Sequence, residues 1–278
     1  MHSRTAAIAV VVVALHVNSG CSQGSDTQSS SSSAEITESS AELSLVAIGD
    51  SVPHDNLDAC PGCVGFVDQY GEAIRHATGR AVATANLSQM HNFTVPKLLA
   101  QLPNWEDELT HADAIIVGIA HNSIPLNDDE PCGSPFDEAT QTIEDWSKID
   151  AQCTSDAVAK YGPMYNELYS TIAQWRAGKP TILVTLNRYN DWIGLKEGNL
   201  TKDQEQRTVA MHDAWNTMIC EAAANNGFNC ADVYHAFNGP QGVEPAGNLL
   251  AADYIHPSQQ GHDRIESVLA SAGFAPLT

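Results

Sequence analysis

The sequence predicts an α/β fold in which helices cover both faces of a central parallel sheet of about five strands. Short apolar runs alternate along the chain with longer segments of helical spacing. Strands that are separated by helices pair in parallel, because each helix carries the chain back to the same end of the sheet. Polar side chains follow several of these runs, at the carboxyl edge where such sheets place their functional groups.

The elements follow from periodicity and from their flanking residues. The expected strands are the apolar runs at residues 43–48, 81–87, 114–118, 181–186 and 228–233. The expected helices are residues 64–76, 95–102, 165–176, 201–224 and 259–272. Thr201, with Gln204 three residues later, has the pattern of a capping box. Residues 119–162 are predicted to be a long loop, and residues 41–278 a single domain.

Composition limits the classes of partner. The 278 residues include 34 acidic and 13 basic side chains, for a formal net charge of −21. Nucleic-acid binding needs a basic surface, and docking on anionic lipid needs one too, so both are disfavoured. With 43% hydrophobic residues the chain can bury a substantial core.

Residues 1–20 have the pattern of an export signal. Arg4 precedes an apolar run at residues 6–15, and small residues follow before Cys21. Ten helical residues rise about 15 Å, which is too short to cross a bilayer. We therefore expect the protein to be exported.

Residues 21–40 are rich in serine and are expected to be a disordered tether. Cys21 opens this segment, as in a bacterial lipoprotein whose first mature residue is lipidated, although Asn18 stands where leucine is usual. The alternative is ordinary cleavage that leaves Cys21 unpaired. The expected location is extracellular or at the cell surface, with membrane contact only through this possible anchor.

The remaining six cysteines are an even number in an exported chain, which predicts disulfides. Six cysteines allow fifteen pairings, and proximity in the sequence favours three local ones. These pairs are Cys60–Cys63, Cys132–Cys153 and Cys220–Cys230. A C-x-x-C redox centre is the alternative for the first pair, but its Pro-Gly loop favours a structural clip.

Serine, histidine and aspartate gather at the expected carboxyl edge of the sheet. Ser51 follows the first strand, and Asp253 and His256 precede the last helix, three residues apart. A histidine that is oriented by a carboxylate can take the proton of a serine hydroxyl and so activate it as a nucleophile. Asn122 follows the third strand and can donate an amide N–H to the resulting oxyanion.

These blocks, in this order, resemble the SGNH or GDSL-type hydrolases over nearly the whole predicted domain. Gly-Asp-Ser ends at Ser51, the VGIAHNS segment contains Asn122, and Asp-x-x-His-Pro runs from Asp253. The resemblance implies a three-layer flavodoxin-like fold, with Ser51 as nucleophile, His256 as base and Asp253 as its partner. A second Asp-x-x-His, from Asp232 to His235, lacks the following Pro-Ser and the final helix, so we prefer His256.

The sequence departs from the family pattern at two blocks. The third block reads Ala-His-Asn-Ser instead of Gly-x-Asn-Asp, and it keeps the asparagine as Asn122. At the second block, His91 occupies the position of the glycine whose backbone N–H completes the oxyanion hole beside Ser51 and Asn122. Met90 and Asn92 remain alternatives for that donor.

The predicted activity is hydrolysis of a small-molecule, lipid or polysaccharide ester through an acyl-enzyme. It requires no cofactor, and the sequence has no spacing typical of a metal site. Within the enzyme class, a carbohydrate acetylesterase is the alternative to a lipase. The alternative from another class is a non-catalytic, ligand-binding surface lipoprotein that retains the fold. The sequence leaves the oligomeric state open.

Overall fold

The computed structural model describes residues 41–55, 58–90, 92–122, 130–133, 136–137, 142–143, 145–194 and 200–278. The expected export signal (1–20), the tether (21–40), Cys21 and His91 lie outside these residues. None of the described helices is long and apolar enough to cross a bilayer.

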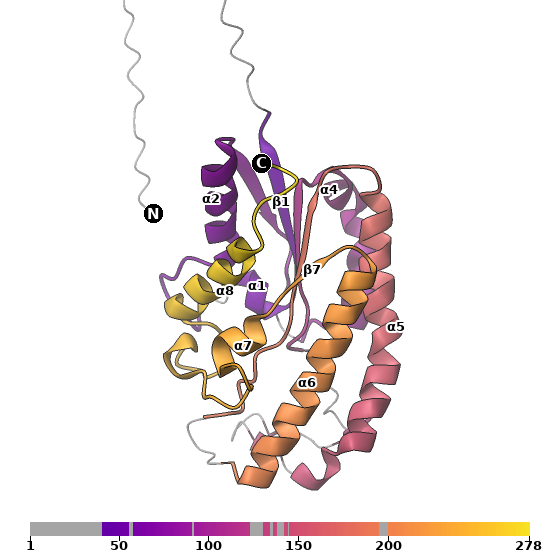
Figure 1. The fold of residues 1–278 in the computed structure, drawn as a ribbon, viewed down its shortest axis with the longest axis vertical. Coiled ribbons are helices and arrows are strands. Elements are labelled where there is room, and N and C mark those ends of the chain that lie inside the picture. Colours follow the sequence, from indigo (N-terminus) through magenta and orange to yellow (C-terminus); the bar gives the residue numbers. More distant parts are fainter. Residues whose placement is uncertain are drawn as a thin grey trace, which may run out of the picture. The chain divides into compact units, whose positions relative to one another are not determined.

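The central sheet is parallel, with strand order β2-β1-β3-β6-β7 (Figure 1). Its strands are β1 (Leu43–Gly49), β2 (Val82–Asn86), β3 (Ala114–Gly118), β6 (Ile182–Leu186) and β7 (Asn229–Ala231). A separate antiparallel pair consists of β4 (Phe136–Asp137) and β5 (Thr142–Ile143). The five-stranded parallel sheet confirms the predicted fold class.

Helices surround this sheet. The α-helices are α1 (Ser51–His54), α2 (Phe66–Thr78), α3 (Val95–Gln101), α4 (Glu106–His111), α5 (Ala151–Trp175), α6 (Lys202–Asn225), α7 (Val233–Asn238) and α8 (Gln259–Ser271). The 3₁₀ helices are η1 (Leu102–Trp105), η2 (Trp146–Lys148) and η3 (Gly247–Leu249).

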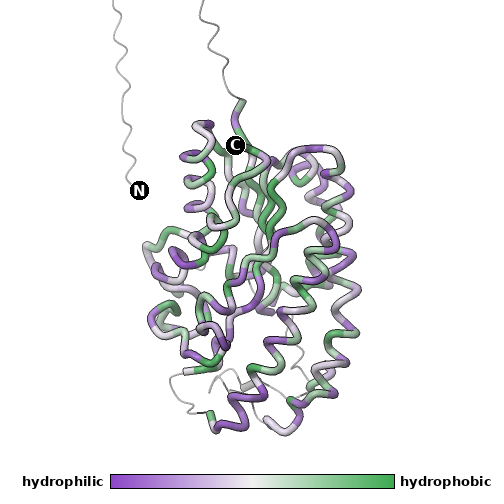
Figure 2. The backbone as a smooth tube through the Cα atoms, in the orientation of Figure 1, coloured by the Kyte–Doolittle hydropathy of each residue, from purple (hydrophilic) through white to green (hydrophobic). Residues whose placement is uncertain are grey.

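Alternate side chains of the strands build two separate cores. On one face, Leu45 and Ile116 pack with residues of α2, α7 and α8. On the other face, Val46 and Ile115 pack with residues of α3, α4, α5 and α6. Figure 2 shows the resulting hydrophobic centre, with helices of mixed hydropathy outside it. Helices therefore cover both faces of the sheet, because strands such as β1 and β3 carry apolar side chains on both faces.

The topology fixes where a site can form. β1 pairs with both β2 and β3, so the chain moves to one side of β1 and then returns to the other. α2 covers one face on the way out, and α3 and α4 cover the opposite face on the way back. The carboxyl ends of β1 and β3 are thus a topological switch point, where open α/β sheets bind their ligands.

The expectation of a loop over residues 119–162 is wrong at its end, because α5 begins at Ala151 and contains Pro163. Asp150 caps this helix by accepting a hydrogen bond from the backbone N–H of Cys153, with an O···N distance of 2.8 Å. A buried stripe then continues at helical spacing through Ala157, Tyr161 and Tyr165. Packing of this stripe outweighs the helix-breaking tendency of proline, which had suggested a later start.

The structure joins the six cysteines of the domain in three disulfides: Cys60–Cys63, Cys132–Cys153 and Cys220–Cys230. These are the local pairs that sequence proximity favours. The second bridge attaches the described segment 130–133 to the first turn of α5, and the third joins α6 to β7.

A glycine is required where β1 meets β3. A Cβ atom on Gly49 would lie 2.0 Å from the backbone oxygen of Gly118, its partner in the strand pairing. We predict that Gly49→Ala lowers the free energy of unfolding by at least about 3 kcal/mol, in the range of severe overpacking. Gly162→Ala is the matched control, because a Cβ there meets only Met218 at ordinary contact distance within α5. Urea denaturation should show it unchanged or stabilised by about 0.5–1 kcal/mol, and equal effects at the two sites would contradict the argument.

Candidate active site

Ser51 lies at the switch point, one turn beyond the end of β1. It is the first residue of α1, and Asp50 caps that helix by accepting a hydrogen bond from the backbone N–H of Val52 at 3.0 Å. The backbone N–H of Asp50 in turn donates to the backbone oxygen of Gly118 on β3, at 2.9 Å. The hydroxyl-bearing turn is therefore fastened to the neighbouring strand.

Asp50 connects this turn to the segment that follows β3. Its side chain is fully buried, and besides the Val52 N–H it accepts the backbone N–H of His121 at 2.9 Å. Burial raises the pKa of Asp50 to about 6, while the N–H groups of Val52, His121 and Asn122 act in the lowering direction. The carboxylate thus holds the segment containing Asn122 beside Ser51.

Ser51, His256 and Asp253 form a hydrogen-bonded chain. The Ser51 Oγ lies 2.9 Å from His256 Nε2, and His256 Nδ1 lies 2.6 Å from Asp253 Oδ2. When Nδ1 donates a hydrogen bond to the carboxylate, Nε2 carries the lone pair that can accept the serine proton. The sequence-predicted serine, base and carboxylate are therefore brought together from opposite ends of the domain.

Asp253 is held in the ionised form that this arrangement needs. Burial alone would raise its pKa, but hydrogen bonds from the His256 ring and from the backbone N–H groups of Ile255 and His256 lower it below its ordinary value. Those two backbone groups lie 3.1 and 3.0 Å from Asp253 Oδ1. The side chain of His256 is only 15% exposed, so its ring is shielded on most sides.

The second Asp-x-x-His forms the same local pair in a different place. His235 Nδ1 lies 2.7 Å from Asp232 Oδ2, and the backbone N–H of His235 donates to Asp232 Oδ1. Within the described residues no serine hydroxyl is hydrogen-bonded to His235, whose side chain is 43% exposed. The pair lies beyond β7, at the edge of the sheet, three strands away from β1.

Asn122 and His91 are the other two expected oxyanion donors. Asn122 lies just beyond β3, with its backbone N–H directed at Asp50. His91 is outside the described residues, but the chain before it runs along β1, because the backbone N–H of Gln89 donates to Gly49 O at 2.9 Å. Asn92 has a φ of 52°, a left-handed conformation that glycine favours and asparagine tolerates.

Tyr189 is a site residue that the motifs did not single out. It is fully buried, and its hydroxyl donates to the backbone oxygen of Ile255 at 2.6 Å, directly beside His256. Its ring lies between those of His121 and Phe237, with centroid distances of 4.2 and 4.5 Å. It therefore supports both the His256 loop and the segment after β3. The sequence signal that could have identified Tyr189 is its position directly after the fourth predicted strand, at the carboxyl edge of the sheet.

A buried polar cluster continues from Tyr189. Arg188 is 3% exposed and forms an ion pair with Asp191, with a nitrogen–oxygen distance of 2.7 Å. Arg188 also donates to Nε2 of His212, whose Nδ1 donates to the backbone oxygen of Thr208. Burial, followed by the charge of Arg188, lowers the pKa of His212 well below its ordinary value. The neutral imidazole can therefore accept a hydrogen bond from the Arg188 guanidinium.

Among the described residues, no group of three histidine, cysteine or acidic side chains is arranged to hold a metal ion. The chemistry that the described site can perform is that of a serine hydroxyl beside a histidine that a carboxylate orients.

Comparison with known proteins identifies a family. The sequence model of the GDSL-like lipase/acylhydrolase family matches residues 47–264. No curated protein matches the chain.

Solved structures share the fold at low sequence identity. The lipase Lip_vut3 from a goat rumen metagenome is similar, with a TM-score of 0.64 and 18% identity over 85% of this chain and 100% of that one. An extracellular lipase from Streptomyces rimosus has a TM-score of 0.55 and 17% identity, covering 83% of this chain and 99% of its own. The acetylxylan esterase Axe2 from Geobacillus stearothermophilus has a TM-score of 0.52 and 15% identity, with coverage of 82% and 93%.

Burial of Asp50 predicts a pH-dependent stability. The pKa of Asp50 is about 6 in the folded state, against an ordinary value of 3.8 for aspartate. The unfolded chain therefore releases this proton at lower pH. The stability linked to this group is fully present below pH 3.8 and is lost as the pH rises through about 6. The difference in the free energy of unfolding between wild type and Asp50→Asn should therefore fall by about 2–2.5 kcal/mol between pH 4 and pH 7.

Chemical denaturation across that pH range measures this difference. Asp107→Asn, at a side chain that is 92% exposed, is the matched control. A wild-type minus Asp50→Asn difference that is flat with pH, or that rises, would contradict the assignment.

Proposed function

Because the chain belongs to the GDSL-like lipase/acylhydrolase family, we propose that it hydrolyses carboxylic esters through an acyl-enzyme formed on Ser51. The observation that carries the proposal is the continuous hydrogen-bonded path from the Ser51 hydroxyl through His256 to Asp253. A serine hydroxyl is a weak nucleophile unless a positioned base removes its proton during attack. The orientation of His256 by Asp253 supports that role.

In the acylation step, Ser51 Oγ forms a bond to the carbonyl carbon while its proton moves to His256 Nε2. The carbonyl electron pair moves onto oxygen and then returns, which breaks the bond to the alcohol oxygen. His256 delivers its proton to that leaving oxygen, so the alcohol departs neutral. The imidazolium that forms in between is stabilised by the ionised Asp253, whose pKa is lowered.

In the deacylation step, His256 takes a proton from water, whose oxygen attacks the acyl carbon. Collapse of the second tetrahedral intermediate breaks the bond to Ser51 Oγ, and His256 returns the proton to that oxygen. The products are the free acid and the original serine. No electron donor or acceptor takes part, so the cycle balances with water as co-reactant.

The oxyanion of both intermediates requires fixed donors. We assign this role to the backbone N–H of Ser51, the side-chain amide of Asn122 and a backbone N–H in the turn at His91. The left-handed Asn92 supports a tight turn there, and Asp50 supports Asn122 by tethering its backbone. Asn92 as the donor is the alternative within the same turn.

Lipid esters and acetylated polysaccharides are both candidate substrates. We also propose that the enzyme acts outside the cytoplasm and is anchored through a lipid on Cys21. Three disulfides in the domain support an oxidising compartment, because such bridges are rare in reducing ones.

Substitution of the histidines in the two Asp-x-x-His segments tests which of them takes part in catalysis. Ser51→Ala and His256→Ala should each lower kcat on p-nitrophenyl acetate by about 10³-fold or more, because either change removes the activated nucleophile. His235→Ala is the matched control, since its hydrogen bonding to Asp232 is nearly the same, and it should retain wild-type activity. An inert wild type, or full activity in Ser51→Ala, would instead favour a non-catalytic binding protein.

The hydroxyl of Tyr189 should affect turnover without binding substrate. Tyr189→Phe removes the donor to Ile255 O and loosens the loop that carries His256. A hydrogen bond worth roughly 1–1.5 kcal/mol corresponds to a five- to tenfold loss in kcat, with little change in KM. Tyr161→Phe is the control, because its hydroxyl donates to the side chain of Glu130 and not to the loop that carries His256. Equal losses in the two variants would show a general effect on folding.

A further inference from the structure

A cleft of about 510 Å³ opens beside the loop that carries Asp253 and His256. One wall comes from the Cys60–Cys63 loop, which follows the nucleophile, and the other from the segment that leads to His256. The residues that matter for its chemistry are Ala59, Cys60, Pro61, Leu250, Ala252 and Tyr254. The cleft therefore lies between the Cys60–Cys63 loop and the turn that carries Asp253 and His256.

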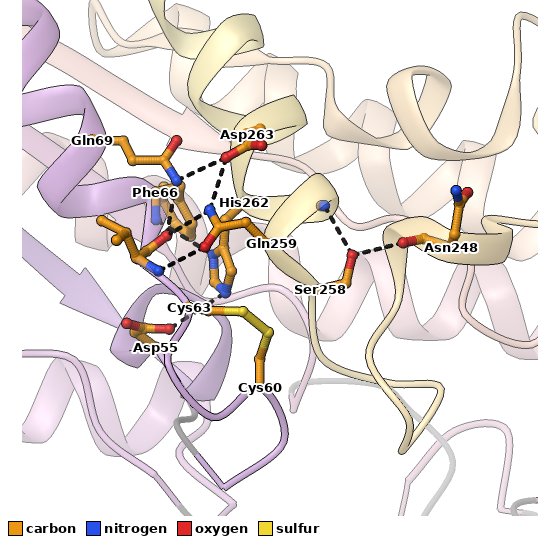
Figure 3. Close-up of a disulfide and its surroundings, with 12 residues drawn as sticks. Asp55, Cys60, Cys63, Phe66, Gln69, Asn248, Ser258, Gln259, His262 and Asp263 are labelled. Carbon is orange, nitrogen blue, oxygen red and sulfur yellow. Dashed lines mark hydrogen bonds and ion pairs between the residues drawn. A yellow bond between two sulfur atoms is a disulfide. The ribbon is translucent and has the colours of Figure 1, made fainter.

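The first wall is held rigidly. The disulfide closes the turn at Cys60 and Cys63 (Figure 3), where the backbone N–H of Cys63 also donates to Cys60 O at 3.1 Å. The next residue, Val64, is fixed by Gln259 of α8, whose Oε1 accepts the Val64 N–H at 2.8 Å. Gln259 also donates to Asp263 at 2.8 Å. This loop is consequently attached to the helix that directly follows the His256 segment.

The second wall is a tight turn of the chain. Leu250 and Pro257 form an antiparallel bridge, and the backbone N–H of Ala251 donates to His256 O at 2.8 Å. At its tip Tyr254 has a φ of 62° and donates its N–H to Ala251 O at 3.0 Å. Since the same turn presents Asp253 and His256, the cleft and the base share one backbone framework.

None of the described residues that line the cleft has a charged side chain. The lining consists of alanine, glycine, proline, leucine, the disulfide sulfur of Cys60, and the hydroxyl-bearing Tyr254 and Ser258. The Ser258 hydroxyl is already engaged with Asn248 O at 2.6 Å. A charged ligand group would meet no opposite charge among the described lining residues, and the chain's net charge of −21 further opposes an anion.

The direction of the reaction indicates which part of the ester faces this cleft. His256 Nε2 must reach the leaving alcohol oxygen to protonate it, so the alcohol departs on the side of the His256 loop. The oxyanion donors, by contrast, come from β1 and from the segment after β3. The cleft borders the His256 loop, and none of the described residues that line it belongs to the described part of the segment after β3.

We propose that this cleft binds the alcohol portion of the substrate, and that this portion is uncharged and largely apolar. The inference rests on the proposed ester hydrolysis. It names a specificity site formed by Leu250, Ala252 and Tyr254 against the Cys60–Cys63 clip.

Independent variation of the alcohol and the acid tests the site. In the full chain, Ala252→Trp introduces an indole at an exposed lining position. It should lower the ratio of kcat/KM for 1-naphthyl acetate to that for methyl acetate by about tenfold or more. The acyl-length profile of p-nitrophenyl esters from acetate to octanoate should keep its shape, because the acid portion lies elsewhere.

Leu250→Ala supplies a second variant with the opposite expectation. It enlarges the cleft, and the same ratio should rise. Ala77→Trp, at an exposed position on α2, is the matched control for adding an indole. Thermal unfolding of each variant verifies the fold. A changed acyl-length profile with an unchanged alcohol ratio would overturn the proposal, as would no change of either in both folded variants.

A matched pair of substrates tests the chemical class. Wild type should prefer methyl 4-acetoxybenzoate over 4-acetoxybenzoate by about tenfold or more, and the preference should persist in 0.5 M salt, which screens long-range repulsion. Equal use of the two would overturn the uncharged class. If wild type shows no turnover that depends on Ser51, the ester hydrolase proposal itself fails. If turnover depends on Ser51 but does not respond to changes in the cleft, only the cleft proposal fails.

Discussion

The carboxylate of Asp50 holds together the parts of the site that come from neighbouring strands. It caps the helix that begins with Ser51 and accepts backbone N–H groups from the segment beyond β3. Removal of this charge from water is costly, and the raised pKa of Asp50 reflects that cost. The hydrogen bonds offset part of it only while Val52, His121 and Asn122 keep their positions. The same interaction therefore couples the placement of Ser51 to that of Asn122.

Local geometry alone does not distinguish the two Asp-x-x-His segments. Their nitrogen–oxygen distances are 2.6 and 2.7 Å, and both aspartates accept the backbone N–H of their own histidine. The difference lies in topology. The segment before α8 reaches the carboxyl end of β1 at the centre of the sheet, whereas the other follows β7 at its edge. A functional group at the switch point meets loops from both directions, and one at the edge does not.

The sequence predicted the strands, the switch-point position of Ser51 and the preference for His256, because these depend on hydrophobic periodicity and on local spacing. It did not predict that α5 begins at Ala151, because Pro163 and the polar residues before it resemble a loop until the buried face of the helix is known. It also missed the ion pair of Arg188 with Asp191 and the partnership of Arg188 with His212. The ion pair lies within the loop after β6, but the contact with His212 joins that loop to α6, and no pattern within one segment encodes it.

The disulfides hold particular chain segments in place more than they stabilise the fold as a whole. They close short stretches, with sequence separations of 3, 21 and 10 residues. Since the entropy lost by the unfolded chain grows with loop length, short loops restrain it least. Two of the bridges instead fix chain that follows site residues, after Ser51 and after β3, while the third joins α6 to the edge strand β7. In a fold whose chemistry depends on loops beyond the strands, cross-links in those loops limit the motion of the site, while the two apolar cores already hold the sheet.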